Sequence, residues 1–284
     1  MASLKDLRRR IRATRSMQQI FKAMEMVAAA KLRRAQQRAQ ASSPYAEKIT
    51  AMLANLAGAA SELDHPLFKA REVKTTALVV ITSDRGFAGA YNANVLRAAE
   101  QRIRSAPRGT VQVVAVGRKG RDYLRRRGYP LLFSHADLPG EASLDLARQL
   151  TEELTERFVH GEVDRVEILY SHFVSALVRR VRTEVFLPVA AAEGAAPRDR
   201  GTIFEPNPES IFRELVVRYA TARLYAAMAD ALASEHSARM VAMGSARKNA
   251  GDLVDSLTLT RNRLRQAAIT REIAELVGGA EALK

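Results

Sequence analysis

The stretch that decides the fold is "KAMEMVAAAKLRRAQQRAQ", residues 22–40. It contains no Gly and no Pro, and nearly all of its residues are strong helix formers. The pattern predicts a long N-terminal helix over residues 1–63, which Pro44 either kinks or restarts. Its apolar face follows steps of three and four through Leu4, Leu7, Ile11, Met17, Ile20, Phe21, Met24, Val27, Ala28 and Leu32.

A second long helix is predicted over residues 207–284. Asn207 suits an N-cap, Pro208 suits the first helical position, and no proline follows. Its apolar residues recur mostly at heptad-like steps, at Ile211, Leu215, Tyr219, Tyr225, Leu232, Met240, Met243, Leu253, Leu257 and Leu264. Neither helix can bury its stripe on a small module alone. We therefore expect the two chain ends to bury their stripes on each other as an antiparallel coiled coil.

Residues 74–203 have a different pattern, in which strands and helices alternate. Short β-branched runs predict strands at 75–83, 110–117, 164–173 and 183–191, and helical runs lie at 95–103, 118–128 and 144–159. This alternation favours an open, Rossmann-like α/β sheet with parallel pairs. The predicted fold is an α/β insertion between two helices that form a long antiparallel coiled coil, with domains at 1–63, 74–203 and 207–284.

The chain of 284 residues carries a net charge of +14 and has no Cys, which excludes disulfides and thiol chemistry. It has no apolar run long enough to span a membrane. Residues 1–40 hold eleven Lys and Arg against Asp6 and Glu25, a net charge of +9. Such a segment fits nucleic acid, an acidic protein surface or anionic lipid, and a simply solvated helix face is the alternative.

The sequence shows no complete motif for enzyme chemistry. The loop "DRGFAGAYNAN" (84–94) follows a strand, but Gly86 and Gly89 do not form a dinucleotide fingerprint. We expect these glycines to serve a tight turn instead. No histidine pair has zinc spacing, and adjacent residues such as Ser171 and His172 point to opposite faces of a strand. The sequence predicts no catalytic, cofactor-binding or metal residue.

Both chain ends resemble one family. The segments at 7–36, "LRRRIRATRSMQQIFKAMEMVAAAKLRRAQ", and 233–283, "ASEHSARMVAMGSARKNAGDLVDSLTLTRNRLRQAAITREIAELVGGAEAL", are similar to the gamma subunit of F-type (rotary) ATP synthase. The middle is similar through "TSDRGFAGAYNAN", "GRKGRD" and "FVSALV". The resemblance covers nearly the whole chain in the same order.

This resemblance implies a rotor in the central stalk, whose coiled coil threads a ring of alpha and beta subunits. The α/β domain would lie near the membrane ring of c subunits, and the epsilon subunit would bind there. The chain itself would be non-catalytic, because nucleotide sites in the family lie on beta with help from alpha. It would have no cofactor, bind no nucleic acid, and meet the membrane only through the complex, at the cytoplasmic face of a bacterial plasma membrane.

The resemblance also implies particular contact residues. Met24 and Arg239 match positions near a beta loop, and the remaining matches for beta loops and the ring bearing are Arg265, Gln266, Thr270, Ile273 and Leu276. Phe204 and Glu205 resemble a stretch close to the c ring. Arg247 and Lys248 depart from the family, which usually has Thr-Asp there.

Two other functions stay open at this point. A basic helical nucleic-acid-binding protein would use the N-terminal charge, although Phe21 is the only aromatic residue in 1–40. A dinucleotide enzyme built on residues 74–203 would need the fingerprint that is broken here.

Overall fold

The computed structural model describes residues 3–59, 65–138, 140–189 and 208–281. Its contacts divide the chain into two compact units. Residues 1–28 and 240–284 form what we call the terminal unit, and residues 29–239 form the sheet unit. Two long helices, α1 (Leu4–Ala59) and α5 (Pro208–Glu281), contribute to both units, and α1 passes through Pro44 without ending.

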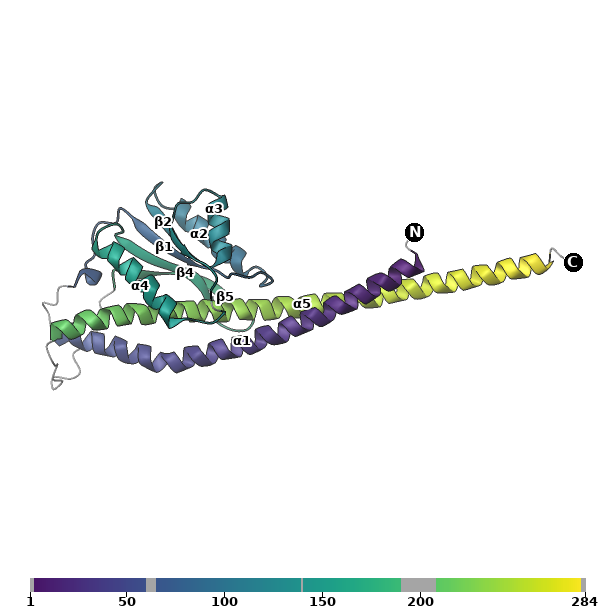
Figure 1. Ribbon diagram of the computed structural model, residues 1–284, viewed down its shortest axis with the longest axis horizontal. Helices are drawn as coiled ribbons and strands as arrows, with labels where there is room; N and C mark the ends of the chain where they lie inside the picture. Colours follow the sequence, from purple (N-terminus) through teal and green to yellow (C-terminus); the bar gives the residue numbers. More distant parts are fainter. Residues whose placement is uncertain (1–2, 60–64, 139, 190–207, 282–284) are drawn as a thin grey trace. The chain divides into compact units, whose positions relative to one another are not determined.

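The sheet unit is built on five strands in the order β3-β2-β1-β4-β5 (Figure 1). Their bounds are Thr76–Ile81 for β1, Val111–Val116 for β2, Leu131–His135 for β3, Arg165–Phe173 for β4 and Arg179–Leu187 for β5. The first four strands pair in parallel, and β5 pairs antiparallel with β4. The predicted fold class, paired terminal helices around an α/β insertion, is confirmed.

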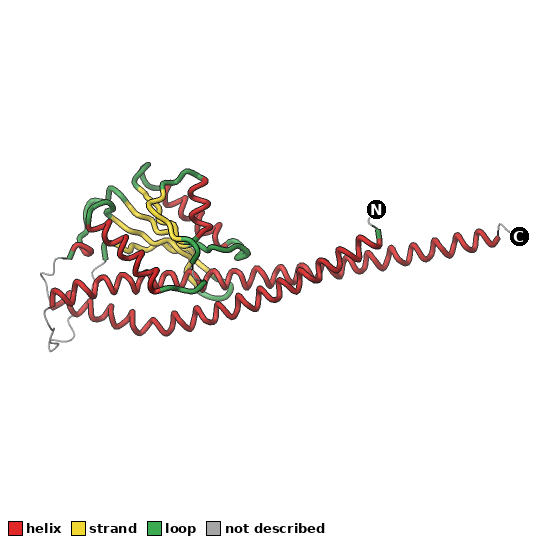
Figure 2. The backbone as a smooth tube through the Cα atoms, viewed as in Figure 1, coloured by secondary structure: helices red, strands yellow, loops and turns green. Residues whose placement is uncertain are grey.

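Both faces of the sheet are covered, which explains why β1 is buried along its whole length and apolar from Ala77 to Ile81. Helices α2 (Tyr91–Arg104) and α3 (Arg118–Arg126) pack on the face that carries Leu78 and Val80. Helix α4 (Leu144–Val159) and parts of α1 and α5 cover the face that carries Val79. A short 3-10 helix, η1 (Pro66–Phe68), adds Leu67 to the second core. Figure 2 shows these layers by secondary structure.

Two strands differ from the sequence prediction. The prediction missed β3, a short edge strand whose residues are all only half-buried. It also began β5 four residues late, because the first residues of that strand include exposed Arg180 and Arg182. Edge strands bury little on their outer side, so they lack the apolar run that marks a central strand. Phe204, Glu205 and Asn207 lie outside the described residues.

The predicted apolar stripes are partly wrong. Met17, Ile20 and Val27 are 46%, 56% and 56% exposed, whereas Thr14 is buried. The side chains that are buried in α1 follow strict steps of three and four or whole heptads, at Leu7, Ile11, Thr14, Ala28, Leu32, Ala35, Ile49 and Leu53. On α5, Val254 is buried and Leu253 is exposed. The contact with a partner helix selects the heptad positions, and polarity alone did not reveal them.

Candidate functional site

The two chain ends lie side by side in the terminal unit (Figure 1). A Cβ atom at Gly251 of α5 would lie 2.9 Å from the Nε2 atom of Gln18, and one at Gly244 would lie 3.2 Å from the Oε1 atom of Glu25. From the first of these contacts to the second, the residue number rises by seven on α1 (Gln18 to Glu25) and falls by seven on α5 (Gly251 to Gly244). The helices are therefore antiparallel and in heptad register.

The glycines of α5 make room for polar side chains in this seam. Gln18 and Glu25 are half-buried between the helices, and each lies against one glycine. Arg247 adds an ion pair across the seam, with its Nε atom 2.8 Å from Glu25 Oε2. The departure from the family pattern at Arg247 thus supplies a bond between the two helices. No described contact assigns a role to Lys248.

The last part of α5 lies open in the terminal unit. The register places Leu4, the first residue of α1, opposite residue 265 of α5. Beyond that point α5 faces no turn of α1, and the side chains of residues 266–277 are exposed apart from half-buried Ala268. The predicted contact residues Arg265, Gln266, Thr270, Ile273 and Leu276 all lie on this exposed segment. Met24 lies on α1 and is half-buried.

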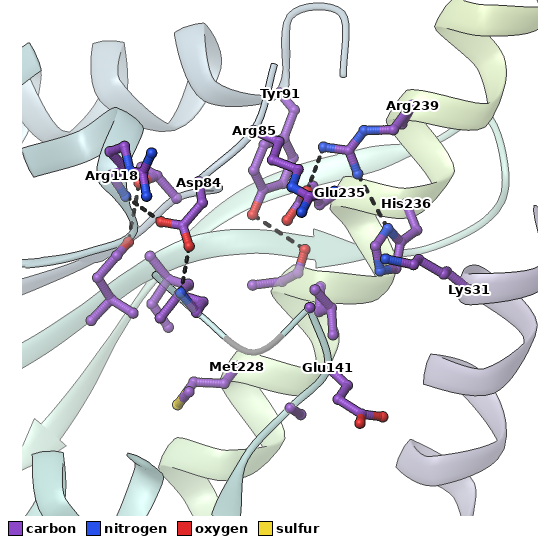
Figure 3. A pocket seen from close by; sticks show the side chains of 18 of the residues that line it. Lys31, Asp84, Arg85, Tyr91, Arg118, Glu141, Met228, Glu235, His236 and Arg239 are labelled. Atoms are coloured by element: carbon purple, nitrogen blue, oxygen red, sulfur yellow. Dashed lines mark hydrogen bonds and ion pairs between the residues drawn. The ribbon is translucent and has the colours of Figure 1, made fainter. Parts of the chain in front are cut away.

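Arg239 is placed differently, inside the sheet unit (Figure 3). Its Nη2 atom lies 2.5 Å from Glu235 Oε1, and its Nε and Nη2 atoms donate to the carbonyl oxygen of Gly86 at 3.3 and 3.2 Å. Its Nη1 atom lies 3.3 Å from His236 Nδ1. Only 13% of the Arg239 side chain is exposed. The guanidinium therefore holds the loop between β1 and α2 against α5.

Burial perturbs the titration of the groups around Arg239. Burial raises the pKa of Glu235, and the nearby Arg239 only partly opposes that shift. Burial also lowers the pKa of His236 to about 4, helped by the charges of Arg239 and Lys31. His236 is therefore neutral at pH 7, so its Nδ1 atom can accept a hydrogen bond from Arg239.

Tyr91 forms a second hydrogen-bonded connection between α5 and the loop that Arg239 contacts, the loop between β1 and α2. Its hydroxyl donates to the carbonyl oxygen of Ala231 at 3.2 Å. The ring forms a small apolar cluster with Ala88 and Ala238, and burial raises the pKa of the phenol well above its usual value. The backbone turns sharply just before it, with a φ of +62° at Phe87 and +56° at Gly89. Gly89 therefore serves the turn, as the sequence indicated, whereas Gly86 does not adopt a positive φ.

A third fastening joins α5 to the hairpin between β4 and β5. Asp230 accepts from the backbone N–H of Phe173 at 2.8 Å and contacts His172 Nδ1 at 2.5 Å. Ser237 Oγ donates to the carbonyl oxygen of Ala176 at 2.7 Å and accepts from Arg179. Residues 230–239 of α5 are thus bonded to two separate loops of the sheet.

A cavity of 370 Å³ lies at the carboxyl ends of β1 and β2, where ligands often bind in open α/β sheets. Its lining includes apolar Ile81, Leu146 and Met228 together with charged side chains from the rim. Both carboxylate oxygens of Asp84 already accept hydrogen bonds, from the backbone N–H groups of Arg118 and Leu138.

The described part of the chain shows neither a metal-binding cluster nor a membrane-spanning helix. Within residues 3–59, 65–138, 140–189 and 208–281, no three His, Asp or Glu side chains are grouped so that they could hold a metal ion. The helices described there include none that is apolar enough over a sufficient length to cross a bilayer.

The fold is that of a known class of protein, the central stalk of rotary ATP synthases. The chain aligns with a chain of the central stalk and c ring of the Tetrahymena thermophila mitochondrial ATP synthase, with a TM-score of 0.63 and 26% identity over 80% of this chain and 99% of that one. A chain from the Euglena gracilis mitochondrial ATP synthase, in a structure of OSCP, F1 and the c ring, has a TM-score of 0.72 at 20% identity, over 99% and 94% of the two chains.

Sequence comparison identifies the family. Residues 3–283 match the family described as ATP synthase. The ATP synthase gamma chain of Moorella thermoacetica is 46% identical over the full length of both chains, and that of Desulforamulus reducens is also 46% identical over both full lengths. The chain belongs to the ATP synthase gamma chain family. The alternative of a nucleic-acid-binding protein gains no support from these matches.

The predicted contact residues therefore fall into separate groups. The structure brings together Arg265, Gln266, Thr270, Ile273 and Leu276 on one exposed segment, places Arg239 in a buried network, and leaves Phe204 and Glu205 undescribed. Sequence reasoning missed Glu235, Tyr91 and Asp230 as fastening residues. The i,i+4 spacing of Glu235 and Arg239 was a usable signal for one of these bonds, but no pattern indicated Gly86 as the other partner.

Proposed function

We propose that this chain is the rotor of an F-type ATP synthase central stalk. It couples ion flow through the membrane c ring to ATP synthesis or hydrolysis in the alpha/beta ring. Rotation presents unlike faces of the helix pair to each beta subunit in turn. Each face favours a different conformation of beta, so the rotation acts as a sequence of population shifts.

The observation that carries this proposal is the way α5 is held. Residues 230–239 are hydrogen-bonded to two loops of the sheet, and residues 244–251 are in heptad register with α1. A helix fixed in this manner can transmit a twist from the sheet unit along its length. Two packed helices resist twisting better than one, which suits a rotating part.

In this function the chain is a non-catalytic subunit, and it needs no cofactor of its own. The buried polar groups around Arg239 are engaged in holding α5 to the sheet, so they support a mechanical role. Nucleotide chemistry then belongs to the alpha and beta subunits. The segments 1–63 and 207–284 are the proposed rotor helices, and 74–203 is the proposed base that meets epsilon and the c ring.

The proposed contacts with the ring come from different parts of the chain. Arg265, Gln266 and Thr270 are exposed and available to beta loops, and Ile273 and Leu276 are available to an apolar bearing. Met24 is proposed to meet a beta loop from α1. Arg239 belongs to the same functional set, and we propose that it contributes by holding the loop at Gly86. Phe204 and Glu205 remain proposed neighbours of the c ring.

The proposed location is the cytoplasmic face of a bacterial plasma membrane, where the chain is peripheral and attached through its complex. Affinity purification of the tagged chain from the native membrane tests the proposal. Recovery of alpha, beta, epsilon and c subunits in fixed ratio is the expected result. Recovery of the intact chain without alpha and beta would overturn the proposal.

A further inference from the structure

The cavity at the carboxyl ends of β1 and β2 has no task in the proposed function (Figure 3). Its volume of 370 Å³ falls within the range of small-molecule pockets, which is about 300–1,000 Å³. All of its described lining residues belong to the sheet unit, and they come from both long helices and from the loops after β1, β2 and β3. This end of a parallel sheet is a usual place for a ligand.

Much of the lining is apolar. The ends of β1 and β2 contribute Ile81 and Val116, and α5 contributes Met228 and Ala231, all of which are buried. Half-buried Leu146 of α4 adds a further apolar side chain. An alkyl chain seated against these groups would leave water, which strengthens binding about fourfold for each buried methylene.

The carboxylates of the described lining are already engaged within the chain. They belong to Asp84, Asp137, Glu141 and Glu235. Backbone N–H groups hold the first of these, and each of the others pairs with an arginine, in turn Arg118, Arg38 and Arg239. These carboxylates are therefore not available to hold a cationic ligand.

Two cations of the lining have no such partner. Within the described residues, Lys31 of α1 and Arg85 of the loop after β1 make no ion pair and no side-chain hydrogen bond. Figure 3 shows Lys31 extending from α1 toward His236, which is neutral at pH 7 and carries no charge of either sign to the cavity. Because the carboxylates are paired, Lys31 and Arg85 leave an unmatched positive charge that would attract an anionic group.

The backbone around the cavity favours a carboxylate over a phosphate. Phosphate sites in α/β folds use free N–H groups at the start of a helix. At the start of α3, the N–H groups of residues 118–120 already donate to oxygen atoms of residues 82–84. A carboxylate needs no such cradle, and a guanidinium group can bind it in a bidentate manner.

We propose that this cavity binds a small amphiphilic carboxylate, with its apolar chain against Met228 and Ala231 and its anionic group at Lys31 and Arg85. The site goes beyond the proposed rotor function and needs no contact with another subunit. Its ligand would touch α1, α5 and the loop after β1 together, so binding should stabilise the attachment of α5 to the sheet.

A series of fatty acids tests the proposal on the unmodified full-length chain. Calorimetry measures the binding of hexanoate, heptanoate and octanoate, each below its micelle concentration. We expect one saturable site, a Kd for octanoate below about 1 mM and a Kd about fourfold higher for each methylene removed. Octylamine, which has the opposite charge, should bind at least about tenfold more weakly than octanoate. Equal affinities along the series, or equal affinities of amine and acid, would overturn the proposal.

The double variant Lys31→Gln/Arg85→Gln tests the anionic end of the site. Its matched control is Arg33→Gln/Arg108→Gln, which removes the same charge from exposed positions of the sheet unit outside the cavity. We expect about tenfold weaker binding of octanoate by the cavity variant and less than about twofold for the control. Neutral octanol should bind both variants as it binds the unmodified chain. Equal octanoate affinities of the two variants would contradict the proposal.

Methionine signals locate the ligand without any change to the charges. Met228 is the one methionine of the described lining, whereas Met26 and Met52 are exposed and lie outside it. In a chain labelled with ¹³C at its methionine methyl groups, Met228→Leu assigns the Met228 signal. Octanoate should shift that signal with the calorimetric Kd and leave Met26 and Met52 unchanged.

This measurement decides the case even if the cavity variant is misfolded, which a loss of octanol binding would reveal. An unchanged Met228 signal at saturating octanoate would rule out the cavity as the site. A shift of the Met228 signal by inorganic phosphate, with displacement of octanoate, would overturn the assignment to carboxylates and indicate a phosphate site.

Discussion

Two stretches of α5 show how one helix can be used in two ways. Residues 224–239 are surrounded, because Leu224, Ala231 and Ala238 are buried and Asp230 and Arg239 bond to loops of the sheet. Residues 253–265 are held only along the seam with α1, residues 266–277 face no turn of α1, and Leu253, Ile269 and Leu276 are exposed. The first stretch gains its order from packing on several sides. The second leaves most of its surface free for partners.

The largest expected effect comes from truncating a leucine in each stretch. Leu224→Ala removes a fully buried side chain from the core and should lower the free energy of unfolding by about 3 kcal/mol. Leu253→Ala is the matched control, because that side chain is 49% exposed, and it should change stability by less than about 0.5 kcal/mol. Urea unfolding of both variants measures the difference. Similar losses for the two leucines would remove the distinction between the stretches.

A smaller change in stability is expected from replacing Arg239 or Arg265, two arginines that the family resemblance assigns to contacts with the ring. Arg239→Gln leaves the buried Glu235 without its cation and the Gly86 carbonyl without two donors, at a cost of about 2 kcal/mol. Arg265→Gln removes an exposed charge and should leave stability within about 0.5 kcal/mol. Hydrogen exchange should show lost amide protection at residues 86–91 in the first variant alone. Unchanged protection there would contradict the holding role of Arg239.

The pH dependence of stability sharpens the comparison further. The pKa of His236 is about 4 in the fold and about 6.5 in an unfolded chain. Between these values the unfolded state binds more protons, so stability falls as pH drops through this window and is fully present above about pH 6.5. The variant His236→Gln should show a shallower loss of stability between about pH 6.5 and pH 4. Identical pH profiles would mean that the pKa of His236 is the same in the folded and unfolded states, and would contradict its burial as a neutral side chain.

The smallest effect concerns two of the ion pairs that involve α5. Glu25 and Arg247 are 28% and 44% exposed, so a double-mutant cycle should give a coupling of about 0.5–1 kcal/mol. Glu235 and Arg239 are 12% and 13% exposed, and their coupling should be clearly larger. Thermal melts in low and high salt measure both cycles. A coupling of the buried pair that is no larger than that of the exposed pair, and equally sensitive to salt, would contradict this ranking.

Much of the fold could be predicted from local pattern. The runs at 75–83 and 110–117 are continuous and β-branched, and they became the central strands β1 and β2. Pro208 became the first residue of α5, as its fixed φ suggests. The edge strand β3 was missed because its half-buried residues carry no comparable signal. The sequence of an edge strand does not show which strand it pairs with.

The candidate site was less predictable than the fold. Family resemblance grouped Arg239 with Arg265, yet one guanidinium is buried and the other is exposed. The cavity lined by Lys31, Arg85 and Met228 joins residues far apart in the chain. Lys31 and Arg85 each have the appearance of an ordinary surface cation in the sequence, and only the tertiary fold brings them to one cavity.

By itself, the sequence determined two long amphipathic helices, a parallel α/β insertion and membership in a rotary family, because helix propensity, strand patterning and motifs are local properties. Only the tertiary structure decided which face of each helix is buried. Thr14 lies in the seam while Ile20 faces outward, and Gly244 and Gly251 accommodate Glu25 and Gln18. The physical reason is that burial depends on the register of two helices, which is set by side chains that meet from opposite ends of the chain.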